Sequence, residues 1–314
     1  MGLVIAAFAA VYIIWGANYL AIRYAVETIP PFLMGGARFL FAGVMMYAIL
    51  RLTGTPSPEG VHWKHAAIAG ALMLGVGNGG LNWAQQRVPS SIAALLIAVT
   101  PLWFALLEWL RPKGTRPTVQ TLAGLFVGFA GAALLATTKD NGQRSIVDPA
   151  GAAALMVASL CFACGSLYVR YAPRPRSAIM SGALQMITGG ALLFGMGFLG
   201  GEAALFDSSK ISTRSIYGFS FLLLIGSTLG YTSYTWLLKV STPARVSTYA
   251  YVNPVVALIL GCTIGGEILT SRMMLAAAIV VVSVIIILTP RRIAPASTQP
   301  AGLSDPSAVA RECP

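Results

Sequence analysis

The chain of 314 residues is 56% hydrophobic and only 10% charged. Soluble domains carry about 25% charged residues, so this composition argues against a soluble globular protein and for an integral membrane protein. The formal net charge is +11, but the Lys and Arg residues fall in short breaks between apolar runs and form no stripe with interleaved aromatic residues. We therefore expect the lipid bilayer, and no nucleic acid, as a partner of this chain.

Apolar runs of about twenty residues, the length that crosses about 30 Å of hydrocarbon, follow one another along the chain. They predict an all-α integral membrane protein with ten transmembrane helices, at residues 3–24, 31–51, 66–86, 90–110, 119–138, 150–170, 178–199, 216–238, 244–264 and 272–290. The loops between them are short, so neighbouring helices are expected to be antiparallel. Residues 293–314 are rich in Pro, Ala and Ser and are predicted to form a disordered tail.

Lys and Arg are more numerous in one set of alternate loops than in the other, where acidic residues accompany them. Because basic loops stay in the cytoplasm, this asymmetry predicts a multi-pass protein of the bacterial inner (plasma) membrane. Both termini, including the tail, are then expected to be cytoplasmic, and an even number of helices agrees with that. We expect a monomer.

An internal repeat relates the two halves of the sequence. Aligning Pro101 with Pro254 overlays SIAALLIAVTPLWFALL (91–107) on ARVSTYAYVNPVVALIL (244–260). Five predicted helices per half is an odd number, so the second half should lie inverted relative to the first. Inverted repeats are typical of secondary transporters, whose single site near the midplane is exposed alternately to the two sides.

The repeat also predicts the division of the chain. A first five-helix repeat is expected at residues 1–143, a second at 144–292, and the tail follows at 293–314.

Pro101 and Pro254 each fall near the middle of a predicted helix. A proline removes one backbone donor, which frees the carbonyl four residues earlier, here that of Ile97 and that of Ala250. In lipid such carbonyls need another partner, so the kinks should face protein or a water-lined cavity. They are interpreted either as static packing kinks or as hinges for alternating access.

Polar and aromatic residues recur at i, i+3 or i+4 spacing within the predicted helices, which places them on shared faces. Each is either an interhelical hydrogen-bonding group or part of a substrate cavity. Together they predict a cavity that suits a small amphipathic solute. The residues predicted to bind substrate are Trp15, Asn18, Asn78, Asn82, Trp103, Tyr234, Tyr249 and Asn253.

Arg38 is the one charged residue deep inside a predicted helix. It can pair with a substrate carboxylate, bind carbonyls at a broken helix, or extend toward the surface. A structural role is favoured over the substrate carboxylate.

The sequence lacks the residues that several classes of activity require. No Asp, Glu, Lys or His lies at mid-span, which argues for facilitated diffusion or unusual coupling rather than a proton pump. There is no GxxxxGK[ST] loop for an ATP-driven pump and no clustered nucleophile and base for an enzyme. Cys161 and Cys164 have CxxC spacing within an apolar helix without nearby His, so neither a metal site nor another cofactor is expected.

Three segments carry a family resemblance. WGANYLAIRYAVETIPPFLMGGARFLFAG (15–43), NGGLNWAQQRVPSSIAALLIAVTPLW (78–103) and STYAYVNPVVALILGCTIGGE (247–267) resemble EamA-type transporters of the drug/metabolite transporter superfamily. The resemblance covers about residues 3–290. It implies two inverted five-helix repeats, no bound cofactor, and export of amino acids, related metabolites or toxic amphipathic compounds.

Some of the family's residues match positions in this chain. Arg38 matches the second-helix arginine of the family, Pro101 and Pro254 match its two repeat prolines, and Glu267 matches an acidic residue after the second proline. Gly114 stands at the corresponding position of the first half, which departs from the common pattern. Glu108 is therefore not assigned the role of that acidic residue.

The leading hypothesis is a secondary transporter that exports amino acids or related small metabolites across the inner membrane by alternating access. The alternative is a multidrug exporter of lipophilic cationic compounds, which aromatic rings can bind through cation–π contacts.

Overall fold

The computed structural model describes residues 2–88, 90–112, 114, 116–136, 148–264 and 271–288, and helices account for most of these residues. No strand occurs in these ranges. The tail at 293–314, Glu267 and the boundary predicted between residues 143 and 144 lie outside the described residues.

The first half begins with two long helices and continues with interrupted ones. Its elements are α1 (Gly2–Ala25), α2 (Pro31–Leu52), α3 (Gly60–Gly70), the π-helical η1 (Ala71–Asn78), α4 (Gly79–Ala84), α5 (Ser90–Ile97), α6 (Thr100–Leu110) and α7 (Val119–Ala136). The segments from α3 to α4 form one continuous rod, whereas α5 and α6 are separated at residues 98–99.

The second half repeats this order. Its elements are α8 (Pro149–Tyr171), α9 (Ala178–Leu199), the short α10 (Glu202–Leu205) and 3-10 helical η2 (Ser208–Lys210), α11 (Thr213–Phe221), the π-helical η3 (Leu222–Gly230), α12 (Tyr231–Val240), α13 (Pro243–Val246), α14 (Tyr249–Thr263) and α15 (Ser271–Leu288). Again a π-helical segment interrupts the third rod, and a break precedes the helix that contains the proline.

Five helical stretches are long and apolar enough to cross a membrane by length and composition: 2–25, 31–52, 149–171, 178–199 and 213–240. Shorter apolar helices at Val119–Gly131 and Tyr249–Thr263 accompany them. Large apolar side chains on these elements are exposed, as expected of a surface that faces lipid rather than water; Leu199 is 93% and Phe126 76% exposed.

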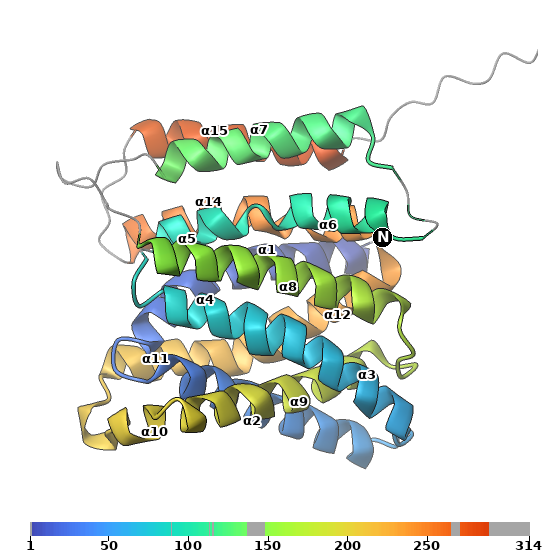
Figure 1. Ribbon diagram of the computed structural model, residues 1–314, viewed down its shortest axis with the longest axis vertical. Coiled ribbons are helices and arrows are strands. Elements are labelled where there is room, and N and C mark those ends of the chain that lie inside the picture. The colour runs from blue at the N-terminus through green and yellow to red at the C-terminus, as the bar shows by residue number, and fades with distance from the viewer. Residues whose placement is uncertain are drawn as a thin grey trace, which may run out of the picture.

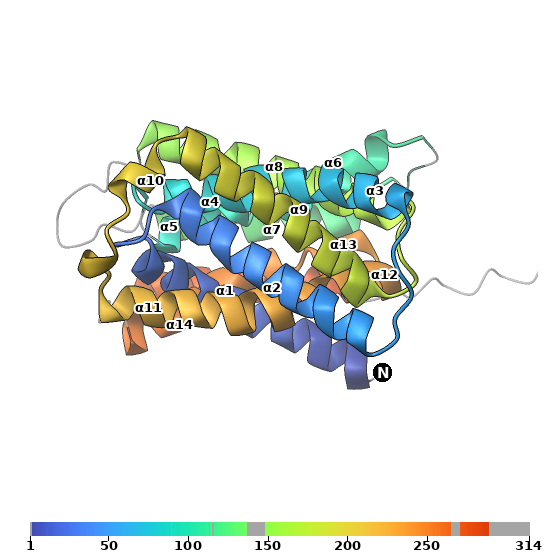
Figure 2. The same ribbon diagram turned by 90° about the horizontal axis from the view of Figure 1, so that it is seen from below.

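Equivalent helices of the two halves pack against each other. Figure 1 shows α7 beside α15 on one side of the bundle and α2 crossing α9 on the other; Figure 2 shows α2 and α9 from below. The α2–α9 contact is reciprocal. A Cβ added to Gly43 would lie 2.8 Å from Ile187 N, and one added to Gly190 would lie 2.7 Å from Leu40 N. Glycines at a helix crossing let the backbones approach, as is common in membranes.

Glu202 joins the two long crossing helices at their ends. The N-terminus of α2 starts at Pro31 and has no side-chain cap from its own sequence. Instead, the carboxylate of Glu202, just after α9, accepts hydrogen bonds from Phe32 N at 3.0 Å and from Leu33 N at 2.9 Å. A carboxylate at a helix N-terminus satisfies free donors and complements the helix dipole.

Candidate substrate cavity

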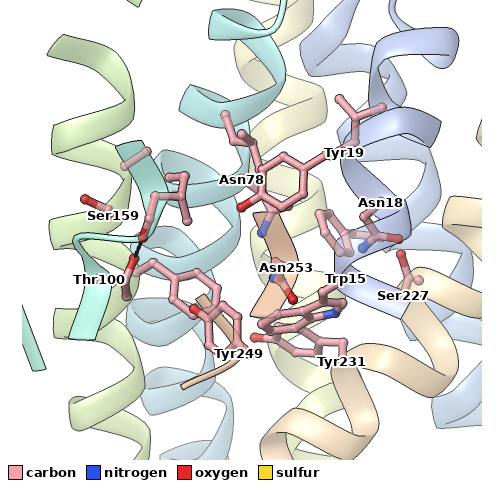
Figure 3. A pocket seen from close by; sticks show the side chains of 18 of the residues that line it. Trp15, Asn18, Tyr19, Asn78, Thr100, Ser159, Ser227, Tyr231, Tyr249 and Asn253 are labelled. Atoms are coloured by element: carbon pink, nitrogen blue, oxygen red, sulfur yellow. Dashed lines mark hydrogen bonds between the residues drawn. The ribbon is translucent and has the colours of Figure 1, made fainter. Parts of the chain in front are cut away.

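A cavity lies between the two halves and receives side chains from both (Figure 3). Its volume is about 70 Å³, measured as the space that the centre of a water molecule can occupy. The lining residues are Trp15, Asn18, Tyr19, Ile22, Arg38, Phe39, Gly77, Asn78, Leu81, Ile97, Thr100, Ala158, Ser159, Phe162, Gly226, Ser227, Tyr231, Tyr249 and Asn253. A mostly apolar lining with a few convergent polar groups is typical of a small-molecule site.

Five of the predicted substrate-binding residues line the cavity: Trp15, Asn18, Asn78, Tyr249 and Asn253. They come from α1, the end of η1, and α14. The fold therefore brings into one cavity five side chains that are far apart along the chain and that the sequence pattern predicted to bind substrate.

The other three predicted residues lie outside the lining. Asn82 is fully buried, and its Nδ2 donates to Pro31 O at 3.4 Å. Trp103 donates from Nε1 to Ser159 Oγ at 3.0 Å. Tyr234, also fully buried, donates its hydroxyl to Ser166 Oγ at 2.7 Å.

Tyr234 nevertheless supports the aromatic wall of the cavity. Its ring centroid lies 4.7 Å from that of Trp15, 5.4 Å from Phe162 and 5.7 Å from Tyr249. Trp15 and Tyr249 meet edge to face at 4.9 Å. Offset and edge-to-face pairs of this kind each add about 0.5–1.5 kcal/mol beyond area burial, so the rings form a preorganised wall.

The residue before each proline donates a side-chain hydrogen bond to a backbone carbonyl. Pro101 is at the start of α6, and Thr100 Oγ1 donates to Ile97 O, the carbonyl that the proline frees, at 2.5 Å. Pro254 lies inside α14. The preceding Asn253, with its amide nitrogen oriented toward the backbone, donates to Tyr249 O at 2.9 Å and to Tyr12 O at 3.2 Å. In each half, the residue before the proline therefore bonds a backbone carbonyl through its side chain and also lines the cavity.

Arg38 is the one charged side chain among the described residues that line the cavity. It is 1% exposed, and its Nη2 donates to Asn78 Oδ1 at 3.0 Å. Its guanidinium carbon lies 4.3 Å from the ring centroid of Phe39. Within the described part of the chain, no carboxylate pairs with it and its Nε has no hydrogen-bond partner.

Several residues outside the predicted set also line the cavity. Ser227 and Tyr231 lie four residues apart and share a helical face, whereas Tyr234 lies behind the lining. Ser159 and Phe162 lie on α8 among small and apolar residues that give no polar periodicity.

Comparison with known proteins decides the family. The EamA-like transporter family matches the chain twice, at residues 2–137 and 149–289. The chain belongs to the EamA-like transporter family. It is a small-molecule membrane transporter, and its two EamA matches coincide with the two series of helices described above.

Relatives with curated names agree with this membership. The uncharacterized inner membrane transporter YedA of Escherichia coli strain K12 is 36% identical over 263 residues, covering 83% of each chain. Protein PecM of Dickeya dadantii is 27% identical, covering 79% of this chain and 80% of its own. A protein named probable amino-acid metabolite efflux pump, from Salmonella typhimurium, is 24% identical, covering 84% and 87%.

A protein of known crystal structure shares the fold. It superposes with a TM-score of 0.69 at 19% sequence identity, covering 91% of this chain and 96% of its own.

Proposed function

We propose that this EamA transporter exports amino acids or related small metabolites across the inner membrane by alternating access. The cavity between the halves carries this proposal, since it combines an aromatic wall with the guanidinium of Arg38 and the amide of Asn78. The name of the Salmonella relative, a probable amino-acid metabolite efflux pump, points to the same substrate class. No enzymatic reaction is part of the proposal.

The proposed mechanism rests on ten spanning helices arranged as two inverted repeats. The matching order of long, π-interrupted and broken helices supports it, as does the reciprocal packing of Gly43 and Gly190. One end of the helices carries many basic residues, among them Arg111, Arg170 and Lys239. That distribution supports cytoplasmic termini. Rocking of the halves about the broken rods α5–α6 and α13–α14 would switch the side to which the cavity opens.

Export of lipophilic cations is the second candidate, and the ring cluster of Trp15, Phe162 and Tyr249 favours it. The charge of Arg38 opposes it, because a buried cation repels another one.

A counterflow assay separates the two candidates. Purified full-length protein in proteoliposomes loaded with unlabelled solute should accumulate at least one labelled neutral amino acid, and Asn78→Leu should reduce this accumulation. Uptake of quaternary ammonium dyes without any amino-acid counterflow would establish the second candidate. Neither activity across a broad panel would contradict the proposed function.

A further inference from the structure

Arg38 and Gln185 hold the same position in equivalent helices. Each is the eighth residue of a 22-residue helix, α2 in the first half and α9 in the second. The reciprocal contacts of Gly43 with Ile187 and of Gly190 with Leu40 fix this register, because each glycine likewise holds the same place in its helix.

Both residues make the same kind of tie. Arg38 Nη2 donates to Asn78 Oδ1 at 3.0 Å, and Asn78 is the last residue of η1. Gln185 Oε1 accepts a hydrogen bond from Tyr231 OH at 2.8 Å, and Tyr231 directly follows η3. In each half the second helix is thus bound to the end of the π-helical segment.

The second half therefore shows that a hydrogen bond from the second helix to the end of the π-helical segment needs no charge. A neutral glutamine makes it, so holding the π-helical segment does not explain why position 38 is a cation. Removing a guanidinium from water is strongly unfavourable unless an anion or several hydrogen bonds compensate. Arg38 makes one hydrogen bond to a neutral amide, and its Nε is buried without a partner in the described part of the chain.

Other unpartnered polar atoms lie in the same cavity. Asn18 Oδ1 and Ser227 Oγ are buried and have no hydrogen-bond partner in the described structure. Figure 3 shows the two side chains next to each other, and a Cβ added to the neighbouring Gly226 would lie 2.7 Å from Asn18 Oδ1. The cavity thus offers a cationic donor at Arg38 and uncompensated acceptors at Asn18 and Ser227.

We propose that Arg38 anchors the carboxylate of a zwitterionic substrate whose ammonium group faces Asn18 and Ser227. No carboxylate of the described residues pairs with Arg38, so the substrate carboxylate supplies its countercharge. Guanidinium–carboxylate bonds are among the strongest available in a desolvated site. The amide and hydroxyl accept from the ammonium, beside the Trp15 ring. This inference deepens the proposed function and rests on its assignment of the cavity as the substrate site.

Binding to the purified full-length protein tests this without transport. The neutral L-amino acids are compared with the amines left by their decarboxylation and with the acids that lack the amino group, by ligand-induced shifts of the unfolding temperature and by Kd. We expect at least one amino acid to stabilise the protein and to bind about tenfold or more tightly than its amine. An amine or a deaminated acid that binds as tightly as the best amino acid, or the absence of any stabilising amino acid, overturns the proposal.

Arg38→Gln is the matched variant, because it copies the residue that makes the tie in the second half. It should unfold near the temperature of the unliganded wild type, while its Kd for the amino acid rises about 10- to 100-fold and its Kd for the cationic amine does not rise. Arg38→Lys keeps the charge and should lose less affinity for the amino acid than Arg38→Gln does. Unchanged amino-acid affinity in Arg38→Gln contradicts the proposal. If this variant does not fold, the wild-type comparison still decides.

Binding and transport can fail separately. Amino-acid binding that depends on Arg38, combined with no counterflow, would refute transport while leaving the carboxylate anchor intact. Counterflow of amino acids that is insensitive to Arg38→Gln would refute the carboxylate anchor while leaving transport intact.

Discussion

The indole N–H of Trp103 donates to the hydroxyl of Ser159 at 3.0 Å, so this tryptophan of α6 reaches the cavity wall only through a residue of α8. Trp103 packs against Phe104, Ala163 and Leu167 rather than lining the cavity. Trp103 is therefore a packing residue, whereas Trp15 lines the cavity. Substitutions of the two should have different effects on transport.

Trp103→Phe keeps an aromatic ring and removes the donor. Because one neutral, partly buried hydrogen bond is lost, the free energy of unfolding should fall by about 1 kcal/mol. The KM for counterflow should stay within about twofold, since the residue does not face the substrate. Unfolding in detergent and counterflow kinetics measure the two effects. Trp15→Phe is the comparison and should raise KM; a larger rise in Trp103→Phe would show that the indole contacts substrate.

Gly190→Ala should destabilise the protein through the α2–α9 crossing. The added methyl carbon would lie 2.7 Å from Leu40 N, which belongs to a rigid backbone and cannot move aside cheaply. We expect a loss of about 1–3 kcal/mol. Gly195→Ala in the same helix is the control: nothing lies within 4 Å of its added carbon, so stability should be unchanged or slightly higher. Equal unfolding temperatures for both variants would contradict the close crossing.

Glu202→Gln should weaken the attachment of α2. The amide keeps one acceptor oxygen but loses the charge that complements the helix N-terminus, where Phe32 N and Leu33 N are bound. The expected loss is about 0.5–2 kcal/mol and should shrink in high salt. Glu27→Gln, at a nearby exposed position, controls for the change in net charge. A salt-independent loss of the same size in both variants would be evidence against capping by Glu202.

Thr100→Val should leave the carbonyl of Ile97 without its hydroxyl partner, at a cost of about 1–3 kcal/mol. Pro101→Ala restores a backbone N–H four residues after Ile97. The double variant should therefore recover part of the stability lost in Thr100→Val. A double-mutant cycle of unfolding free energies measures this coupling. Strictly additive effects would show that Thr100 does not compensate for the proline.

Much of the helix arrangement follows from hydropathy. The predicted helix at 178–199 has the observed bounds of α9. The predicted 31–51 is one residue shorter than α2 at its C-terminal end, and 150–170 is one residue shorter than α8 at each end. The rod that starts at Gly60 begins six residues earlier than predicted, because Glu59 and His62 form a capping box ahead of the apolar run.

The π-helical segments η1 and η3 could not be predicted in the same way. Both lie in continuous apolar runs, where a change from i→i+4 to i→i+5 bonding leaves no mark on the hydrophobic pattern. Asn78 lines the cavity, whereas Asn82, one turn later on α4, bonds the carbonyl of Pro31 instead. Polar residues identify the interior of a membrane bundle, but packing decides which of them face its cavity.

The most direct test of the account asks whether the cavity is the transport path. A full-length protein with Cys161, Cys164, Cys262 and Cys313 replaced by Ser receives a single thiol through Ser227→Cys, and a small thiol-specific methanethiosulfonate is added to proteoliposomes during amino-acid counterflow. Modification should abolish counterflow, and the transported amino acid should slow modification; Gly195→Cys, which has nothing within 4 Å of its added carbon, should be modified without effect. Undiminished counterflow after complete modification at position 227 would contradict transport through this cavity.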